Sequence, residues 1–231
     1  MIKALIFDFD GTLSNRQINA YGVFDHYLRS YFKDLDDLEY EGILQDLLTF
    51  DCNGTIPVRM RLIPFIDKYG EYLPEDFADD FTAYFYDQMY RFTVMGEDVE
   101  DTLKRLKDKY KMAILSNGNS KSQHNKIDAL PLERYFDDIF VSGDYGIHKP
   151  EKQIFEMVAE QLGVRCNECM MIGDVFSSDI LGAIRAGMVP VWLVTDYQRP
   201  ARYYHGYRIG KLSDIFAVLE KEETHEYTGN Q

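Results

Sequence analysis

The sequence has few cysteines and no long hydrophobic run, and each shortage excludes a class of protein. Its 231 residues include only three cysteines, Cys52, Cys166 and Cys169. An odd number this small is no disulfide framework, which points to a reducing compartment. No stretch approaches the roughly 20 apolar residues of a membrane-spanning helix, and the first residues lack the pattern of a secretory signal peptide. We therefore expect a cytoplasmic protein.

Basic residues are scarce relative to acidic ones. Lysine and arginine number 25 against 39 aspartates and glutamates, which gives a formal net charge of −14. Nucleic acids and anionic membranes carry the same sign of charge, so we expect neither as a partner. A small phosphorylated ligand is still compatible, because a local cation can hold it.

Two of the cysteines form an isolated C-x-x-C pattern at Cys166 and Cys169. A zinc site would need a second pair of ligands, and the five histidines are scattered elsewhere. The pattern therefore favours the structural alternative, two small residues beside a buried strand.

Short, continuous apolar runs recur along the chain and predict strands that are buried on both faces, as in a parallel sheet. Amphipathic helical patterns lie between most of them, so strand and helix alternate. This alternation predicts a doubly wound, Rossmann-like α/β core. The predicted strands are residues 4–7, 112–115, 139–141, 170–172 and 191–194.

One interval between predicted strands is far too long for a simple connection. Asp8 and Ser116 follow or end consecutive strands but lie 108 positions apart, whereas a βαβ unit needs only about 30 residues. The excess predicts an inserted all-α domain of four amphipathic helices, with Pro64 bending the third helix or marking its first turn. Residues 21–92 hold 17 of the 33 aromatic residues, which favours aromatic packing inside a small bundle. The predicted division is a core of residues 1–14 and 96–220, an insertion of residues 15–95 and a polar tail of residues 221–231.

Several polar side chains follow the predicted strands, where the carboxyl ends of a parallel sheet form a ligand-binding edge. Clustered carboxylates repel one another unless a cation lies among them. Oxygen ligands without histidine or cysteine suit Mg²⁺, which also bridges to phosphate. The sequence thus predicts a magnesium-assisted pocket for a phosphoryl group, in which one carboxylate could attack phosphorus. The residues brought to this edge are Asp8, Asp10, Ser116, Lys149, Asp174 and Asp179.

These residues resemble the four ordered motifs of the haloacid dehalogenase superfamily. The matching segments are Asp8-Phe9-Asp10-Gly11-Thr12-Leu13, Ser116, Lys149-Pro150 and Gly173-Asp174-x4-Asp179. The position of the helical insertion is similar to that of the C1 cap of subclass I. The dehalogenase branch lacks the second acid of the first motif, so Asp10 favours phosphoryl transfer over dehalogenation.

The resemblance implies a role for each matching residue. Asp8 would be the nucleophile and a metal ligand, and Asp10 would be the general acid and base, with its backbone carbonyl on the metal. Ser116 would bind a phosphoryl oxygen, and Lys149 would pair with the phosphoryl group and Asp8. Asp174 would bind Mg²⁺ directly, while Asp179 would support it or a metal-bound water, or would serve as an acid in the first turn of a helix.

Other polar positions remain candidates beside simpler structural explanations. Four residues could offer donors to phosphate, although turn formation explains the glycines equally well: Gly11, Thr12, Asn117 and Gly118. Five residues of the insertion could set substrate specificity, although helix-end or surface roles fit them as well: Asn15, Arg16, Gln17, Arg59 and Arg61.

The sequence therefore predicts a Mg²⁺-dependent phosphatase that acts through an aspartyl-phosphate on Asp8. The expected partner is a small phosphorylated metabolite: a sugar phosphate, a nucleoside monophosphate or a small phospho-acid. A phosphomutase with the same intermediate and a non-catalytic phosphate- or partner-binding module are the alternatives. A monomer and a homodimer are both compatible with the sequence.

Overall fold

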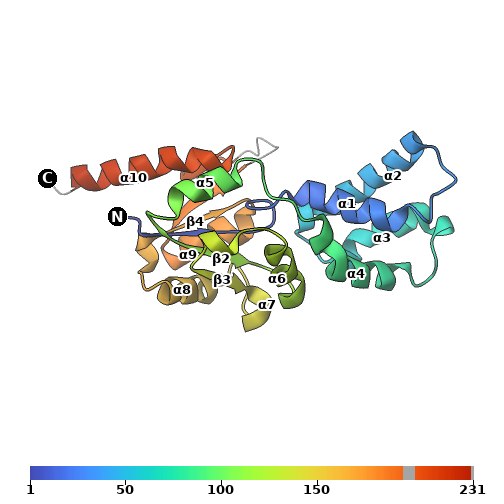
Figure 1. Cartoon of the computed structure of the whole chain (residues 1–231), viewed down its shortest axis with the longest axis horizontal. Helices are drawn as coiled ribbons and strands as arrows, with labels where there is room; N and C mark the ends of the chain where they lie inside the picture. Colours follow the sequence, from blue (N-terminus) through green and yellow to red (C-terminus); the bar gives the residue numbers. More distant parts are fainter. Residues whose placement is uncertain (195–200, 230–231) are drawn as a thin grey trace. The chain divides into compact units, whose positions relative to one another are not determined.

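The computed structural model describes residues 1–194 and 201–229. The chain divides into two compact units (Figure 1), one formed by Met1–Ser14 with Met95–Gln231 and the other by Asn15–Val94. We call them the α/β unit and the helical unit. Among the described residues, no helix combines the length and the apolar character that a membrane crossing requires.

The described part of the α/β unit contains one sheet of six parallel strands in the order β3-β2-β1-β4-β5-β6. The order reverses direction between β1 and β4, which are neighbours in the sheet, and such a reversal is where doubly wound folds bind ligands. The predicted α/β fold is thus confirmed. The strands are β1 Ala4–Phe7, β2 Lys111–Ser116, β3 Asp138–Val141, β4 Cys169–Gly173, β5 Val189–Leu193 and β6 Tyr207–Ile209.

Helices cover both faces of the sheet, because successive strand residues point to opposite sides. Leu5 and Phe7 pack in one core with residues of α5, α6 and α10, while Ala4 and Ile6 pack in a second core with α8 and α9. Figure 1 shows α5 and α10 on one side of the sheet and α8 and α9 on the other. The helices of this unit are α5 Val99–Leu106, α6 Ser120–Asp128, α7 Ser142–Tyr145, α8 Lys152–Gln161, α9 Leu181–Ala186 and α10 Ile215–Gly229.

The C-terminal segment is helical despite its polar composition. Helix α10 continues to Gly229, and its buried residues Ile215, Val218 and Leu219 belong to the core beneath α5. The buried start of α10 thus anchors the helix to the core, and the polar residues after it continue the same helix. Of the predicted tail, Asn230 and Gln231 lie outside the described residues.

The helical unit consists of four α-helices joined by short turns within Asn15–Val94: α1 Arg16–Leu28, α2 Asp37–Phe50, α3 Val58–Tyr69 and α4 Phe77–Gln88. Its core is rich in aromatic rings, and the centroids of Phe77 and Phe81 lie 5.7 Å apart. Aromatic packing of this kind stabilises a small bundle beyond simple area burial. Pro64 lies in the middle of α3, so it does not mark the first turn of that helix.

Candidate active site

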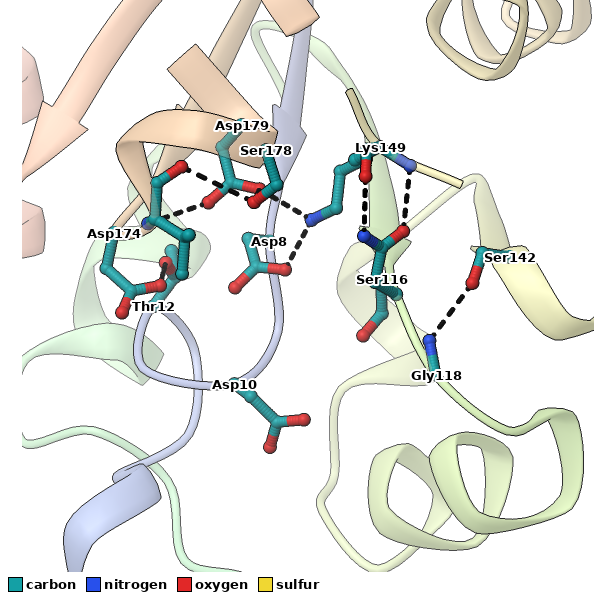
Figure 2. A network of polar contacts seen from close by, with 12 residues as sticks. Asp8, Asp10, Thr12, Ser116, Gly118, Ser142, Lys149, Asp174, Ser178 and Asp179 are labelled. Carbon is teal, nitrogen blue, oxygen red and sulfur yellow. Dashed lines mark hydrogen bonds and ion pairs between the residues drawn. The ribbon is translucent and has the colours of Figure 1, made fainter. Parts of the chain in front are cut away.

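The carboxyl ends of three neighbouring strands bring together residues from distant parts of the sequence. Asp8 follows β1, Ser116 ends β2 and Asp174 follows β4, and β1 pairs with both of the other strands. Since all three strands are parallel, their last residues meet at one edge of the sheet. The predicted motif residues therefore share one site (Figure 2).

A buried ammonium group links two of the carboxylates. Lys149 Nζ lies 2.5 Å from Asp8 Oδ1 and 2.8 Å from Asp179 Oδ1, and the lysine side chain is only 1% exposed. Burial lowers the pKa of Lys149, but the charges of Asp179 and Asp8 outweigh this effect and the pKa is raised overall. The two carboxylates therefore favour the charged form of Lys149.

Three carboxylates crowd around this single lysine. Oxygen atoms of Asp8, Asp174 and Asp179 all lie within 4.8 Å of one another. Burial, followed by repulsion from Asp179, raises the pKa of Asp8 to about 7 although Lys149 opposes the rise. Burial and the charges of Asp8 and Asp179 likewise raise the pKa of Asp174. Negative charge thus exceeds positive charge here, and this set of oxygen donors fits a hard divalent cation.

The Asp179 carboxyl group contacts both Lys149 and residues of its own loop. Its Oδ1 also accepts a hydrogen bond of 3.0 Å from the Ser178 hydroxyl, and its Oδ2 accepts one of 2.9 Å from the Val175 amide. The residue lies in a π-helical turn, Phe176–Ile180, a rare conformation that is frequent at functional sites. These contacts favour a supporting position for Asp179 beside the candidate metal ligands Asp8 and Asp174.

The turn after β1 depends on glycine. Gly11 has a φ of +87°, and a Cβ atom there would lie 2.5 Å from Asp174 Oδ2. Glycine alone permits both this backbone conformation and this close approach. The neighbouring Thr12 Oγ1 lies 3.5 Å from Asp174 Oδ1, at the long limit for a hydrogen bond. Gly11 and Thr12 thus lie beside the Asp174 carboxyl group.

Asn117 and Gly118 connect the segments after β2 and β3. The Asn117 side chain donates to the Lys149 carbonyl and accepts from the Lys149 amide, both over 2.9 Å. The Gly118 amide donates to Ser142 Oγ over 3.0 Å, and Ser142 Oγ lies 2.8 Å from His148 Nδ1. In this structure the Asn117 side chain and the Gly118 amide therefore fix the backbone around Lys149.

Two further residues of the site, Gln123 and Lys126 on α6, did not emerge from the sequence. Gln123 Nε2 donates to Asp10 Oδ2 over 3.0 Å and to Ser116 Oγ over 2.9 Å. Lys126 forms an ion pair with Asp10 Oδ2, and both α6 side chains are buried. The available signal was two polar residues three positions apart in a helix after a strand, a pattern that is common on solvated surfaces.

The five candidate specificity residues all make contacts within the helical unit. Asn15 caps α1 by accepting a hydrogen bond of 3.2 Å from the Ile18 amide, and Gln17 donates to Asn53. Arg59 is exposed and pairs with Asp79. Of the two candidate arginines of α3, Arg59 therefore lies at the surface and Arg61 in the interior.

Arg16 and Arg61 meet at one buried carboxylate instead. Their guanidinium groups lie 2.9 Å and 2.6 Å from Asp51 Oδ1, and Asp51 is only 1% exposed. Burial and the charge of Arg16 lower the pKa of Arg61, while Asp51 opposes this effect. The cluster joins the start of α1 to α3 through Asp51, the residue that follows α2 as its C-cap.

The cysteine pair lies at the start of strand β4 and just before it. Cys169 is buried in β4 and Cys166 is half-buried, and both are free thiols. Across residues 1–194 and 201–229, the one cluster able to hold a metal ion is formed by Asp8, Asp174 and Asp179, without either cysteine.

The chain is similar in sequence to known hydrolases. A family model of haloacid dehalogenase-like hydrolases matches residues 2–187. Glyceraldehyde 3-phosphate phosphatase from Pyrococcus furiosus is 29% identical over 233 residues, which cover 96% of this chain and 94% of the relative. Pyrimidine 5'-nucleotidase YjjG from Escherichia coli is 37% identical over 121 residues, about half of each chain (52% and 54%).

A solved structure also resembles the chain over nearly its whole length. The HAD-hydrolase YfnB from Bacillus subtilis, solved with bound magnesium, has a TM-score of 0.75 and 26% sequence identity. The alignment covers 94% of this chain and 98% of the other.

Proposed function

Since this chain belongs to the haloacid dehalogenase-like hydrolases, we propose that it is a phosphatase that hydrolyses a small phosphomonoester through an aspartyl-phosphate on Asp8. The observation that carries the proposal is the buried contact between Lys149 and Asp8, beside the carboxylates of Asp174 and Asp179. A carboxylate held by a cation next to a metal-binding set of oxygens is equipped to attack phosphorus.

Asp8 and Asp10 divide the chemistry between them. A carboxylate oxygen of Asp8 forms a bond to phosphorus while the ester oxygen leaves and takes a proton from Asp10. Water then attacks the phosphoryl group and gives a proton to Asp10. This attack breaks the bond between phosphorus and Asp8, so inorganic phosphate is released and the Asp8 carboxylate is restored. Lys149 and the Ser116 hydroxyl stabilise the charge on the phosphoryl oxygens.

The acidic residues of the site provide the ligands for Mg²⁺. The carboxylates of Asp8 and Asp174 and the backbone carbonyl of Asp10 would hold the ion, and Asp179 would support it. When bound, Mg²⁺ offsets the repulsion among the carboxylates and draws charge from the phosphoryl oxygens. Asp8 is then available in its ionised form.

The named activities of the relatives indicate the class of substrate. One relative is a glyceraldehyde 3-phosphate phosphatase and another a pyrimidine 5'-nucleotidase. Both names refer to enzymes whose substrates are small phosphorylated metabolites. We assign the same class to this chain. The helical unit would act as the specificity-determining cap, with Arg59 its exposed cationic candidate.

Release of inorganic phosphate tests the function directly. The panel contains glyceraldehyde 3-phosphate, pyrimidine nucleoside monophosphates, hexose phosphates and small phospho-acids, each with Mg²⁺ and with a chelator. We expect turnover of at least one member with Mg²⁺, reduced by more than about 10³-fold in Asp8→Asn. Asp101→Asn, which alters a 91% exposed acid on α5, serves as the matched control.

The same panel separates the alternatives. Isomerised sugar phosphate without free phosphate would indicate a phosphomutase. Tight binding of metal and phosphate without any reaction would indicate a binding module, and equal turnover by wild type and Asp8→Asn would contradict the proposed nucleophile.

A further inference from the structure

The Asp10 carboxyl group is held by two side chains of one helix. Gln123 Nε2 donates to Asp10 Oδ2 over 3.0 Å, and the Lys126 ammonium pairs with the same oxygen. The two donors lie three positions apart on α6, so they present one face of that helix. Figure 2 shows the Asp10 carboxyl group directed away from that of Asp8.

Lys126 is more deeply buried than its partner Asp10. The Lys126 side chain is 7% exposed, whereas that of Asp10 is 23% exposed. A buried ammonium group is costly unless an acceptor compensates for its lost hydration. Here that acceptor is the Asp10 carboxyl group, whose side chain keeps an exposed fraction of 23%, so Lys126 fixes Asp10 without burying it completely.

Gln123 also connects Asp10 to the phosphate-binding hydroxyl. Its Nε2 also lies 2.9 Å from Ser116 Oγ and 2.6 Å from the Asn117 carbonyl oxygen, so its two hydrogens are shared among hydrogen bonds to three acceptors. A serine oxygen that accepts this hydrogen bond can donate its own hydrogen to a phosphoryl oxygen. One amide group therefore sets the position of Asp10 and the donor direction of Ser116.

We propose that Gln123 and Lys126 are positioning residues that fix the Asp10 carboxyl group for proton transfer. The inference rests on the proposed function, in which Asp10 protonates the leaving oxygen and later accepts a proton from the attacking water. A displaced Asp10 slows both half-reactions of an alkyl phosphate. With p-nitrophenyl phosphate, whose leaving group needs little protonation, it slows only the hydrolysis of the aspartyl-phosphate.

Rapid-mixing kinetics of the full chain with Mg²⁺ and p-nitrophenyl phosphate test this assignment. For Lys126→Met we expect a burst of about one nitrophenolate per site, followed by turnover reduced by about 10²-fold, the usual effect of a misplaced catalytic group. Gln123→Leu is expected to change in the same direction, and Lys126→Arg to recover part of the lost turnover. Lys121→Met, an exposed lysine on the same helix, is the matched control.

The outcomes distinguish positioning from simple structural support. Wild-type turnover in Lys126→Met, or an equal loss in both phases without a burst, would overturn the assignment. Circular dichroism reports whether each variant is folded, and Lys126→Arg keeps the test valid if Lys126→Met unfolds. A wild-type enzyme that releases no phosphate from any substrate would overturn the proposed function itself, a result distinct from an active enzyme with an unimpaired Lys126→Met variant.

Discussion

Lys149 and Asp179 form a buried ion pair, with Nζ 2.8 Å from Oδ1 and both side chains only 1% exposed. The pair joins the segment after β3 to the π-helical turn after β4, and the same ammonium group contacts Asp8. In the proposed function this lysine also acts on the phosphoryl group, so its replacement should affect both stability and activity.

Replacing Lys149 with methionine removes the ammonium group that lies among the three carboxylates. Loss of one partner of a buried pair typically costs about 3–5 kcal/mol, so we expect a lower free energy of unfolding as well as loss of phosphatase activity. Denaturant unfolding without metal measures the first effect. Lys152→Met, at a 52% exposed position, should be nearly neutral, and equal stability of the two variants would contradict the importance of the buried pair.

Mg²⁺ should stabilise the folded protein, because it relieves repulsion among Asp8, Asp174 and Asp179. A ligand present at 100 times its dissociation constant adds about 2.7 kcal/mol to the unfolding free energy. Thermal unfolding with increasing Mg²⁺ should therefore show a rising midpoint in the wild type and a much smaller rise in Asp174→Asn. An identical response in Asp174→Asn would place the ion elsewhere.

Replacing Gly11 with alanine should disturb the turn that carries Asp10. The new Cβ atom would meet Asp174 Oδ2, and the φ of +87° disfavours any side chain. The left-handed conformation alone costs about 1–2 kcal/mol, and we expect kcat to fall together with stability. In Gly42→Ala of α2 the new Cβ would meet nothing within 4 Å beyond its own stretch of helix, so this substitution should instead stabilise by about 0.5–1 kcal/mol. Equal effects of the two substitutions would argue against a special role for Gly11.

Asp51 should matter more to stability than Asp79, although each pairs with arginine in the helical unit. Asp51→Asn leaves the Arg16 and Arg61 guanidinium groups without their buried carboxylate, at a cost of about 3–5 kcal/mol. Asp79→Asn breaks only the exposed contact with Arg59 and should cost less than about 1 kcal/mol. Urea unfolding of both variants gives the comparison, and the reverse ranking would refute it.

Glu168 should give the protein part of its sensitivity to acid. Hydrogen bonds from the side chains of Arg165 and Lys3 hold the pKa of this carboxyl well below its usual range. Because the folded-state pKa lies below the unfolded one, the stabilisation is complete above the unfolded pKa and is lost as the pH falls toward the folded one.

The effect can be isolated by comparing melting temperatures of wild type and Glu168→Gln between pH 3 and 8. The deficit of Glu168→Gln should be largest above about pH 5, beyond the ordinary titration of glutamate, and should shrink in acid. The exposed Glu160→Gln is the control. A deficit that grows as the pH falls would contradict the assigned direction.

Much of the α/β unit could be predicted because it depends on local sequence. Buried strands such as Ala4–Phe7 are continuous apolar runs, and a glycine, Gly187, ends α9 in the left-handed conformation that glycine adopts easily. Strand β6 escaped prediction because it has only three residues, one of them the exposed Arg208. This strand is stabilised by its pairing with β5, because its own sequence has no apolar run.

The sequence by itself determined which residues reach the carboxyl edge of the sheet, because apolar runs locate the strands and chain order then specifies the residue at the end of each. Asp8, Ser116 and Asp174 needed no further information. The tertiary structure decided which side chains touch: Lys149 reaches Asp8 across 141 positions of sequence, and Lys126 reaches Asp10 across 116. Such contacts depend on the packing of helices against the sheet, and a hydrogen bond that requires atoms about 3 Å apart has no counterpart in local residue patterns.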